Sequence, residues 1–280
     1  MTASYEKNKI PQKGKCRNTS RTVKVICLLW GLLIFSRICY DILVYCEGGT
    51  IAVRMTGTYD YLVRFPPGYT DFSAPHPILV FLHGAGEIGH DVKQIADVDP
   101  FHYAAGILPR KDFPFIVLSP VVPHGYYDWN PKAVKVMIDH FLRHRGRLKI
   151  DPSRIYLTGF SMGGFGTFAV AEKYPDLFAA IAPLAGGGEI DRAEPLKSLP
   201  VRAFHGDADN VIPYDCSVKM IEAIKAVGNC DAQLTTVPGG KHQICPDVYG
   251  NPEIYRWFLE HRNEVLNVNS RTSSYEFSCI

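Results

Sequence analysis

The sequence predicts an α/β protein, in which an open, mostly parallel sheet of about eight strands is flanked by helices. From Thr50 onward, short β-branched runs alternate with segments of helical periodicity. The first two runs follow each other as an antiparallel pair would, whereas the later ones are separated by helical segments, as in parallel crossovers. A hydrophobic fraction of 46% and a charged fraction of 21% are ordinary for a soluble globular chain. We therefore expect one main domain.

Eight runs rich in β-branched and aromatic residues are the predicted strands. They are Ile51–Arg54, Tyr61–Phe65, Ile78–Leu82, Phe115–Leu118, Ile155–Thr158, Ala180–Pro183, Val201–His205 and Gln233–Val237. The predicted helices are Ala133–Arg145, Met162–Lys173, Ser217–Ala226 and Pro252–Arg262. The first helix has the clearest pattern, because Val134, Met137, Ile138, Phe141 and Leu142 form a single apolar stripe.

The first 49 residues differ in character from the rest of the chain. Before the apolar run Val25–Phe35, seven lysines and arginines face a single acid, Glu6. This pattern predicts a signal anchor or a signal-peptide-like segment, and with it a membrane-anchored or secreted protein of the secretory pathway. The alternative is a cytoplasmic protein with a buried or interfacial N-terminal helix. The expected divisions are residues 1–49, a globular domain over residues 50–266 and a polar tail over residues 267–280.

Charge and cysteine content exclude two classes of function. A net charge of +2, with no basic stripe interleaved with aromatics in the body of the chain, argues against nucleic acid binding. The eight cysteines show no Cys/His spacing that suits zinc, so we expect no metal. Cys216, Cys230 and Cys245 are candidates for one disulfide in an oxidising compartment.

Ser161 lies between a predicted strand and a predicted helix, in the pentapeptide Gly159-Phe160-Ser161-Met162-Gly163. This matches the pattern G-x-S-x-G, in which a sharp strand-to-helix turn needs glycine on both sides and exposes the serine hydroxyl. A serine in a Gly-rich turn can also be only a turn or cap residue. The strand before it and the helix after it favour a nucleophile.

A serine nucleophile needs a base and an acid that orients the base. On such a fold both follow the serine along the chain, the acid first and the histidine after it. Of the downstream histidines, His261 lies in a helical, surface-like pattern and His205 ends a strand. His242 lies in a loop after a strand, and we take it as the base with Asp209 as its partner. Asp207 is the alternative acid, although Asp between Gly and Ala more often shapes a turn.

Acyl transfer also requires two backbone N–H groups for the oxyanion. Met162 follows the nucleophile and is one predicted donor. The strand Ile78–Leu82 leads into His83-Gly84-Ala85-Gly86, where small residues let a ligand approach the backbone, and Ala85 is the second predicted donor. We expect His83, which precedes the serine, to support this loop.

Four blocks of sequence resemble the α/β-hydrolase group that includes poly(3-hydroxybutyrate) depolymerase-like and feruloyl esterase-like enzymes and prolyl-oligopeptidase-like predicted peptidases. The blocks are LHGAGEIG, RIYLTGFSMGGFGTFAVAEKYPDLFAAIAPLAGGG, HGDADNVIP, and KHQIC followed by NPEIYRWFLEH, spread over roughly Thr58 to His261. The resemblance implies an α/β-hydrolase fold, a Ser161–Asp209–His242 triad, ester hydrolysis through an acyl-enzyme and no cofactor. It departs from the group at Lys241, immediately before His242, where relatives usually have glycine.

The substrate is predicted less sharply than the chemistry. Leu184 and Val201 are 17 positions apart (201 − 184), too few for a large cap domain at that point. An open site favours a small-molecule or polymer-borne ester. Gly84, Glu87 and Trp129 are candidate lining residues, with Tyr126 and Tyr127 beside Trp129; alternatively, Trp129 is core and Glu87 is a solvated carboxylate. Serine peptidase, acyl thioesterase and a catalytically silent binding protein are the other functions considered.

Overall fold

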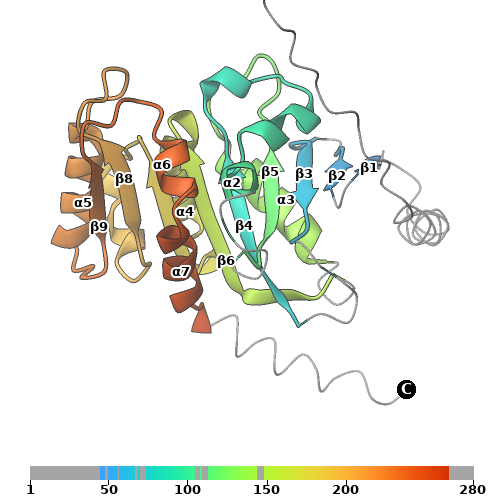
Figure 1. Ribbon diagram of the computed structural model, residues 1–280. Helices are drawn as coiled ribbons and strands as arrows, with labels where there is room; N and C mark the ends of the chain where they lie inside the picture. The colour runs from blue at the N-terminus through green and yellow to red at the C-terminus, as the bar shows by residue number, and fades with distance from the viewer. Residues whose placement is uncertain are drawn as a thin grey trace, which may run out of the picture. The chain divides into compact units, whose positions relative to one another are not determined.

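The computed structural model describes residues 45–47, 50–55, 57–66, 69, 74–104, 108, 113–143 and 148–264 (Figure 1). The predicted N-terminal anchor or signal segment and the polar tail over residues 267–280 lie outside these ranges. Within the described ranges, no helix combines the length and the apolar character that crossing a bilayer requires.

One sheet organises the described chain. Its strands lie in the order β1-β2-β3-β5-β4-β6-β7-β8-β9. Their bounds are β1 Tyr45–Glu47, β2 Thr50–Val53, β3 Tyr61–Arg64, β4 His76–Leu82, β5 Ile116–Pro120, β6 Ile150–Phe160, β7 Ala180–Leu184, β8 Arg202–Gly206 and β9 Gln233–Val237. The strands β1, β2, β3 and β5 pair antiparallel in succession, and every pair from β5 through β4 to β9 is parallel. The predicted α/β class with a mostly parallel sheet is confirmed.

All eight predicted strands are present, and the described chain adds β1, which pairs with β2. The central strand β4 reads HPILVFL and is buried along nearly its whole length, as expected for a parallel strand covered on both faces. By contrast, β9 reads QLTTV, is only partly buried and forms the edge of the sheet, where polar side chains are tolerated.

Helices cover the sheet. They are α2 Pro100–Ala104, α3 Pro131–Leu142, α4 Met162–Lys173, α5 Asp215–Ala226, α6 Cys245–Tyr249 and α7 Pro252–Glu260. Leu79, Phe81 and Tyr156 from the strands cluster with Tyr249 of α6 and Phe258 of α7, which lie in front of the strands in Figure 1. The helix α4 packs on β4, β6 and β7, and α3 packs on α4.

The four predicted helices are present with small shifts at their ends. The helix predicted from Ala133 begins at Pro131, because the side chain of Asn130 accepts hydrogen bonds from the N–H groups of Lys132 (2.9 Å) and Ala133 (3.2 Å) and so caps it. Short 3-10 helices add turns between these elements. They are η1 Ala85–Glu87, η2 Val92–Asp97, η4 Pro175–Leu177, η5 Ile190–Arg192 and η6 Glu194–Leu196. The segment between β7 and β8 holds only η5 and η6, so no cap domain is inserted there, as predicted.

Candidate active site

Ser161 occupies the turn between β6 and α4 in a strained backbone conformation, with φ 56° and ψ −115°. The flanking glycines explain how the turn closes. A Cβ on Gly159 would collide with the Gly163 carbonyl, and a Cβ on Gly163 would collide with the Leu82 carbonyl. The Ser161 N–H donates to the Leu184 carbonyl at 2.9 Å, which ties the turn to β7. The strain is thus held by tight backbone packing on both sides, and the hydroxyl lies at the carboxyl edge of the sheet.

The structure brings the three predicted triad residues together. His242 Nε2 lies 2.9 Å from Ser161 Oγ, and His242 Nδ1 lies 2.8 Å from Asp209 Oδ2. Ser161 follows β6, Asp209 follows β8 and His242 follows β9, so the contacts join three loops at one edge of the sheet. The three side chains form a hydrogen-bonded series in the order that nucleophilic catalysis requires.

Asp209 is held by more than the histidine. Its Oδ1 accepts hydrogen bonds from the N–H groups of Val211 (2.8 Å) and Ile212 (3.0 Å). Burial raises the pKa of this carboxyl, but the hydrogen bonds from His242, Val211 and Ile212 outweigh burial and leave the pKa below its usual value. Asp209 is therefore a carboxylate at neutral pH.

Asp207, the alternative acid, has a different role. Its Oδ1 accepts a hydrogen bond from the Gly239 N–H at 2.6 Å, which joins the turn after β8 to the turn after β9. This agrees with the turn-shaping role considered for it. Lys241 has an exposed side chain, and His242 reaches both Ser161 and Asp209 beside it.

The two predicted oxyanion donors both begin a helix. Ala85 is the first residue of η1 and Met162 is the first residue of α4. Within the described part of the chain, neither N–H donates to an acceptor. Free N–H groups at a helix start are suited to bind an anion.

His83 supports the loop that carries Ala85, as expected. The ring is fully buried; its Nδ1 lies 2.6 Å from the Gly84 carbonyl, and its Nε2 accepts the Val122 N–H at 3.0 Å. Burial lowers the pKa of His83 to about 4. The ring is thus neutral, donates from Nδ1 and holds the loop in place.

One candidate lining residue needs correction. Trp129 is buried rather than exposed as a wall: it donates from Nε1 to the His83 carbonyl at 3.2 Å and packs edge-on to Tyr59. Tyr126 and Tyr127, at 62% and 78% exposure, are the exposed aromatics of that loop. Glu87 is not a freely solvated carboxylate, because its side chain is 24% exposed and burial raises its pKa.

Gly84, the third candidate lining residue, is itself buried, and a Cβ there would lie 3.4 Å from the Phe160 ring. Phe160 is a residue that sequence analysis did not single out. Its ring lies 4.9 Å from the His242 ring, between centroids, so it forms one side of the space around the base. Its position inside the G-x-S-x-G pentapeptide is the signal that could have indicated this contact.

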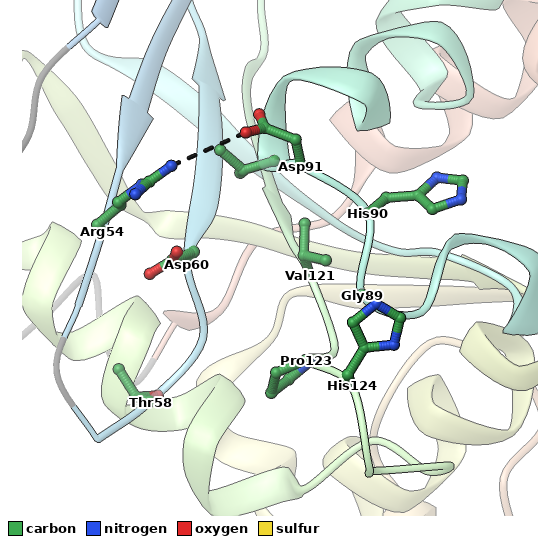
Figure 2. Close-up of a pocket in the computed structure, with 10 residues that line it drawn as sticks. Arg54, Thr58, Asp60, Gly89, His90, Asp91, Val121, Pro123 and His124 are labelled. Atoms are coloured by element: carbon green, nitrogen blue, oxygen red, sulfur yellow. Dashed lines mark ion pairs between the residues drawn. The ribbon is translucent and has the colours of Figure 1, made fainter.

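A cavity of about 530 Å³ lies between the connection from β2 to β3, the segment that joins η1 to η2, and the loop after β5 (Figure 2). Val121 follows β5 and Asp60 precedes the antiparallel strand β3, whose Tyr61 pairs with Pro120 of β5. The lining residues are Arg54, Thr58, Asp60, Gly89, His90, Asp91, Val92, Val121, Pro123 and His124. Figure 2 shows Arg54 directed toward Asp91, with 3.8 Å between Nη2 and Oδ2. None of the triad residues lines this cavity.

Metal and disulfide chemistry find no support in the described residues. Over those ranges, no group of three or more His, Cys, Asp or Glu side chains is arranged to hold a metal ion. Cys216, Cys230 and Cys245 are free thiols, so the candidate disulfide among them is not formed.

The sheet order, the strained serine turn and the Ser-His-Asp series together define an α/β hydrolase arrangement. A profile of the Phospholipase/Carboxylesterase family matches residues 130–251. A solved thermostable esterase superposes with a TM-score of 0.61 at 25% identity, covering 79% of this chain and 63% of the esterase. The chain belongs to the α/β-hydrolase superfamily.

Curated relatives point to the same superfamily. A probable feruloyl esterase C of Aspergillus flavus is 28% identical over 65% of this chain and 67% of its own length. The acyl-protein thioesterase 1 of Mycosarcoma maydis is 25% identical over 62% of this chain and 87% of its own length. Across three curated esterase relatives, the aligned region spans 47% to 67% of their full lengths.

Proposed function

We propose that this protein is a serine hydrolase that cleaves carboxylic esters through an acyl-enzyme on Ser161. The single observation that carries the proposal is the hydrogen-bonded series Ser161–His242–Asp209, with contacts of 2.9 and 2.8 Å. A serine hydroxyl is a weak nucleophile at neutral pH, and a hydrogen-bonded imidazole that can accept its proton removes that limitation.

The reaction proceeds in two steps. As Ser161 Oγ attacks the ester carbonyl, its proton passes to His242 Nε2, and the resulting imidazolium is stabilised by the Asp209 carboxylate. The N–H groups of Met162 and Ala85 bind the oxyanion. The carbon–oxygen ester bond breaks, and the leaving alcohol takes the proton from His242. Water then gives a proton to His242 Nε2 as it attacks the acyl-enzyme. The bond between the acyl carbon and Ser161 Oγ breaks, His242 returns the proton to Oγ, and the acid is released.

One feature supports a substrate carried on a larger body, such as a polymer-borne ester. The segment between β7 and β8 contributes no cap domain that would enclose a substrate at Ser161. The relative named a probable feruloyl esterase supports an ester of an aromatic acid. A thioester is the second candidate substrate, and the likeness to an acyl-protein thioesterase favours it.

A fluorophosphonate probe tests the proposed function directly. We expect the wild-type protein to be labelled and Ser161→Ala to be unlabelled, because the probe requires an activated serine. Ser198→Ala is the matched control: Ser198 is exposed and distant in sequence, so its variant should be labelled like the wild type. A correctly folded wild-type protein that takes no label would favour the silent binding protein instead.

The acyl and leaving-group preference needs a second measurement. Oxygen esters, thioesters and anilides of the same acyl group, compared by kcat/KM, separate esterase, thioesterase and peptidase activity. We expect the oxygen ester to give the highest value, and p-nitrophenyl esters of graded chain length beside feruloyl and hydroxybutyryl esters then measure the acyl site. A higher value for the anilide would reassign the protein as a peptidase.

A further inference from the structure

His205 lies beneath the candidate triad and is not part of the mechanism described above. It is the penultimate residue of β8, and its side chain is fully buried. Its Nδ1 lies 2.7 Å from Ser217 Oγ, and its Nε2 lies 3.1 Å from the Ile212 carbonyl and 3.2 Å from Asp209 Oδ2. The ring therefore contacts the triad acid on the side away from solvent.

The hydrogen-bond partners decide where the ring protons lie. The Ser217 hydroxyl donates its only hydrogen to the Gly186 carbonyl at 2.7 Å, so Ser217 Oγ must accept from His205 Nδ1. At the other end, Nε2 faces the Ile212 carbonyl and the Asp209 carboxylate, and neither oxygen can donate. A bare nitrogen at either position would face the lone pairs of an oxygen. Full satisfaction of the ring requires a proton on both nitrogens.

The remaining surroundings are compatible with a positively charged ring. The Tyr214 ring approaches edge-on, 5.6 Å away between centroids, and its hydroxyl bonds to Thr236 Oγ1. The helix α5 contributes the neutral hydroxyl of Ser217. The facing charged group is Asp209, whose side chain is also fully buried, so the two opposite charges compensate each other.

Asp209 thereby receives contacts on both oxygens. Oδ1 accepts two backbone N–H groups, and Oδ2 lies between His242 Nδ1 at 2.8 Å and His205 Nε2 at 3.2 Å. These four contacts oppose rotation of the carboxylate about its side-chain bonds. Because Oδ2 contacts both rings, His205 helps to keep this oxygen within hydrogen-bond distance of His242 Nδ1.

We propose that His205 is a positioning residue: it carries a proton on each ring nitrogen and holds the Asp209 carboxylate in line with His242. The proposal rests on the proposed function, in which Asp209 orients the base. It adds a second imidazole, which touches neither the substrate nor the reacting atoms and acts through Asp209 alone.

Kinetics of two substitutions test the positioning role. His205→Asn retains an amide near Nδ1 and loses the group that faces Asp209, and we expect kcat to fall about 10- to 100-fold with KM within about twofold. His205→Gln retains an amide donor near Nε2 and should recover part of kcat. His261→Gln is the matched control, since His261 bonds to the Trp257 carbonyl far along the chain from the triad, and it should match the wild type.

The pH profile distinguishes positioning from a general structural role. Removal of a cation beside Asp209 favours the protonated form of His242, so the acid limb of kcat/KM should move to higher pH in both His205 variants. A loss of kcat with an unmoved acid limb would overturn the proposal.

Histidine side-chain ¹⁵N NMR of the full-length wild-type protein tests the proton assignment without any turnover. We expect two protonated ring nitrogens for His205, identified by their absence from the His205→Gln spectrum or, if that variant does not fold, from the His205→Asn spectrum. One protonated and one bare nitrogen would overturn the proposal. Because this readout is independent of activity, it also separates failure of the proposal from failure of the proposed function, which is read from fluorophosphonate labelling of Ser161.

Discussion

Ser161 shows how single residues combine strain with chemistry. Its φ of 56° is unfavourable for a side chain with a Cβ, and it persists because neighbouring backbone leaves no room for relaxation. Each partner of the series is held by its own contacts: Asp209 by two backbone N–H groups, and His242 by Asp209 and by the ring of Phe160. The geometry at the residue scale is thus preorganised before a substrate arrives.

The choice between the two acids is tested at the same scale. Asp209→Asn should lower kcat by roughly 10²- to 10⁴-fold, because an amide at this position no longer stabilises the imidazolium. Asp207→Asn keeps an oxygen that can accept the Gly239 N–H, so we expect a much smaller loss. Steady-state kinetics on a p-nitrophenyl ester gives both values, and the opposite ranking would transfer the proposed role to Asp207.

The helices and strands position the candidate site residues through close contacts between their backbones. The helix α4 starts directly at Met162, so its first turn must pass beside the end of β4. A Cβ on Gly166 would lie 2.5 Å from the Trp129 ring, so α4 also accommodates the buried tryptophan through a glycine. The glycines of TGFSMGGFG are therefore required by contacts with β4, with Leu184 of β7 and with Trp129, as well as by the turn.

The glycine requirement gives a stability prediction. Gly163→Ala should lower the free energy of unfolding by about 3 kcal/mol or more, because the new Cβ meets the Leu82 carbonyl, a backbone atom that cannot move aside. Gly86→Ala is the control, since no atom lies within 4 Å of a Cβ placed there. Urea denaturation followed by circular dichroism measures both; equal midpoints for the two variants would contradict the packing seen at Gly163.

Some helices and strands could not be predicted from the local sequence pattern. The helices α2 and α6 each have five residues, which is too short for an apolar periodicity to be recognised. The strand β6 begins at Ile150, five residues before its predicted start. The prediction missed this early part because it reads IDPSR, with polar residues and a proline. Pairing of Ile150 with His76 of β4 makes this stretch a strand, and that pairing is not visible in the local sequence.

At the scale of the whole molecule, the described domain holds every residue of the proposed mechanism, and the basic, apolar N-terminal segment supplies a separate prediction. We expect the full-length protein to enter the secretory pathway and remain in the membrane pellet after carbonate extraction. Replacement of Leu28, Leu29, Leu32 and Leu33 by serine should abolish this, because it removes the apolar surface that the bilayer would bury. Recovery of the unchanged protein in the soluble cytoplasmic fraction would favour the alternative location.

The sequence by itself determined the fold class, the order along the chain of eight strands and four helices, and the identity of the serine turn, because alternation, periodicity and the spacing of glycines are local properties of the chain. It also narrowed the acid to Asp207 or Asp209 and the base to His242. Only the tertiary structure decided that Asp209 faces His242, that Trp129 is buried beneath the oxyanion loop, and that His205 lies against the carboxylate. These outcomes depend on contacts between residues from 4 to 46 positions apart, where loops from separate strands meet, and packing of that kind has no period that a single sequence can display.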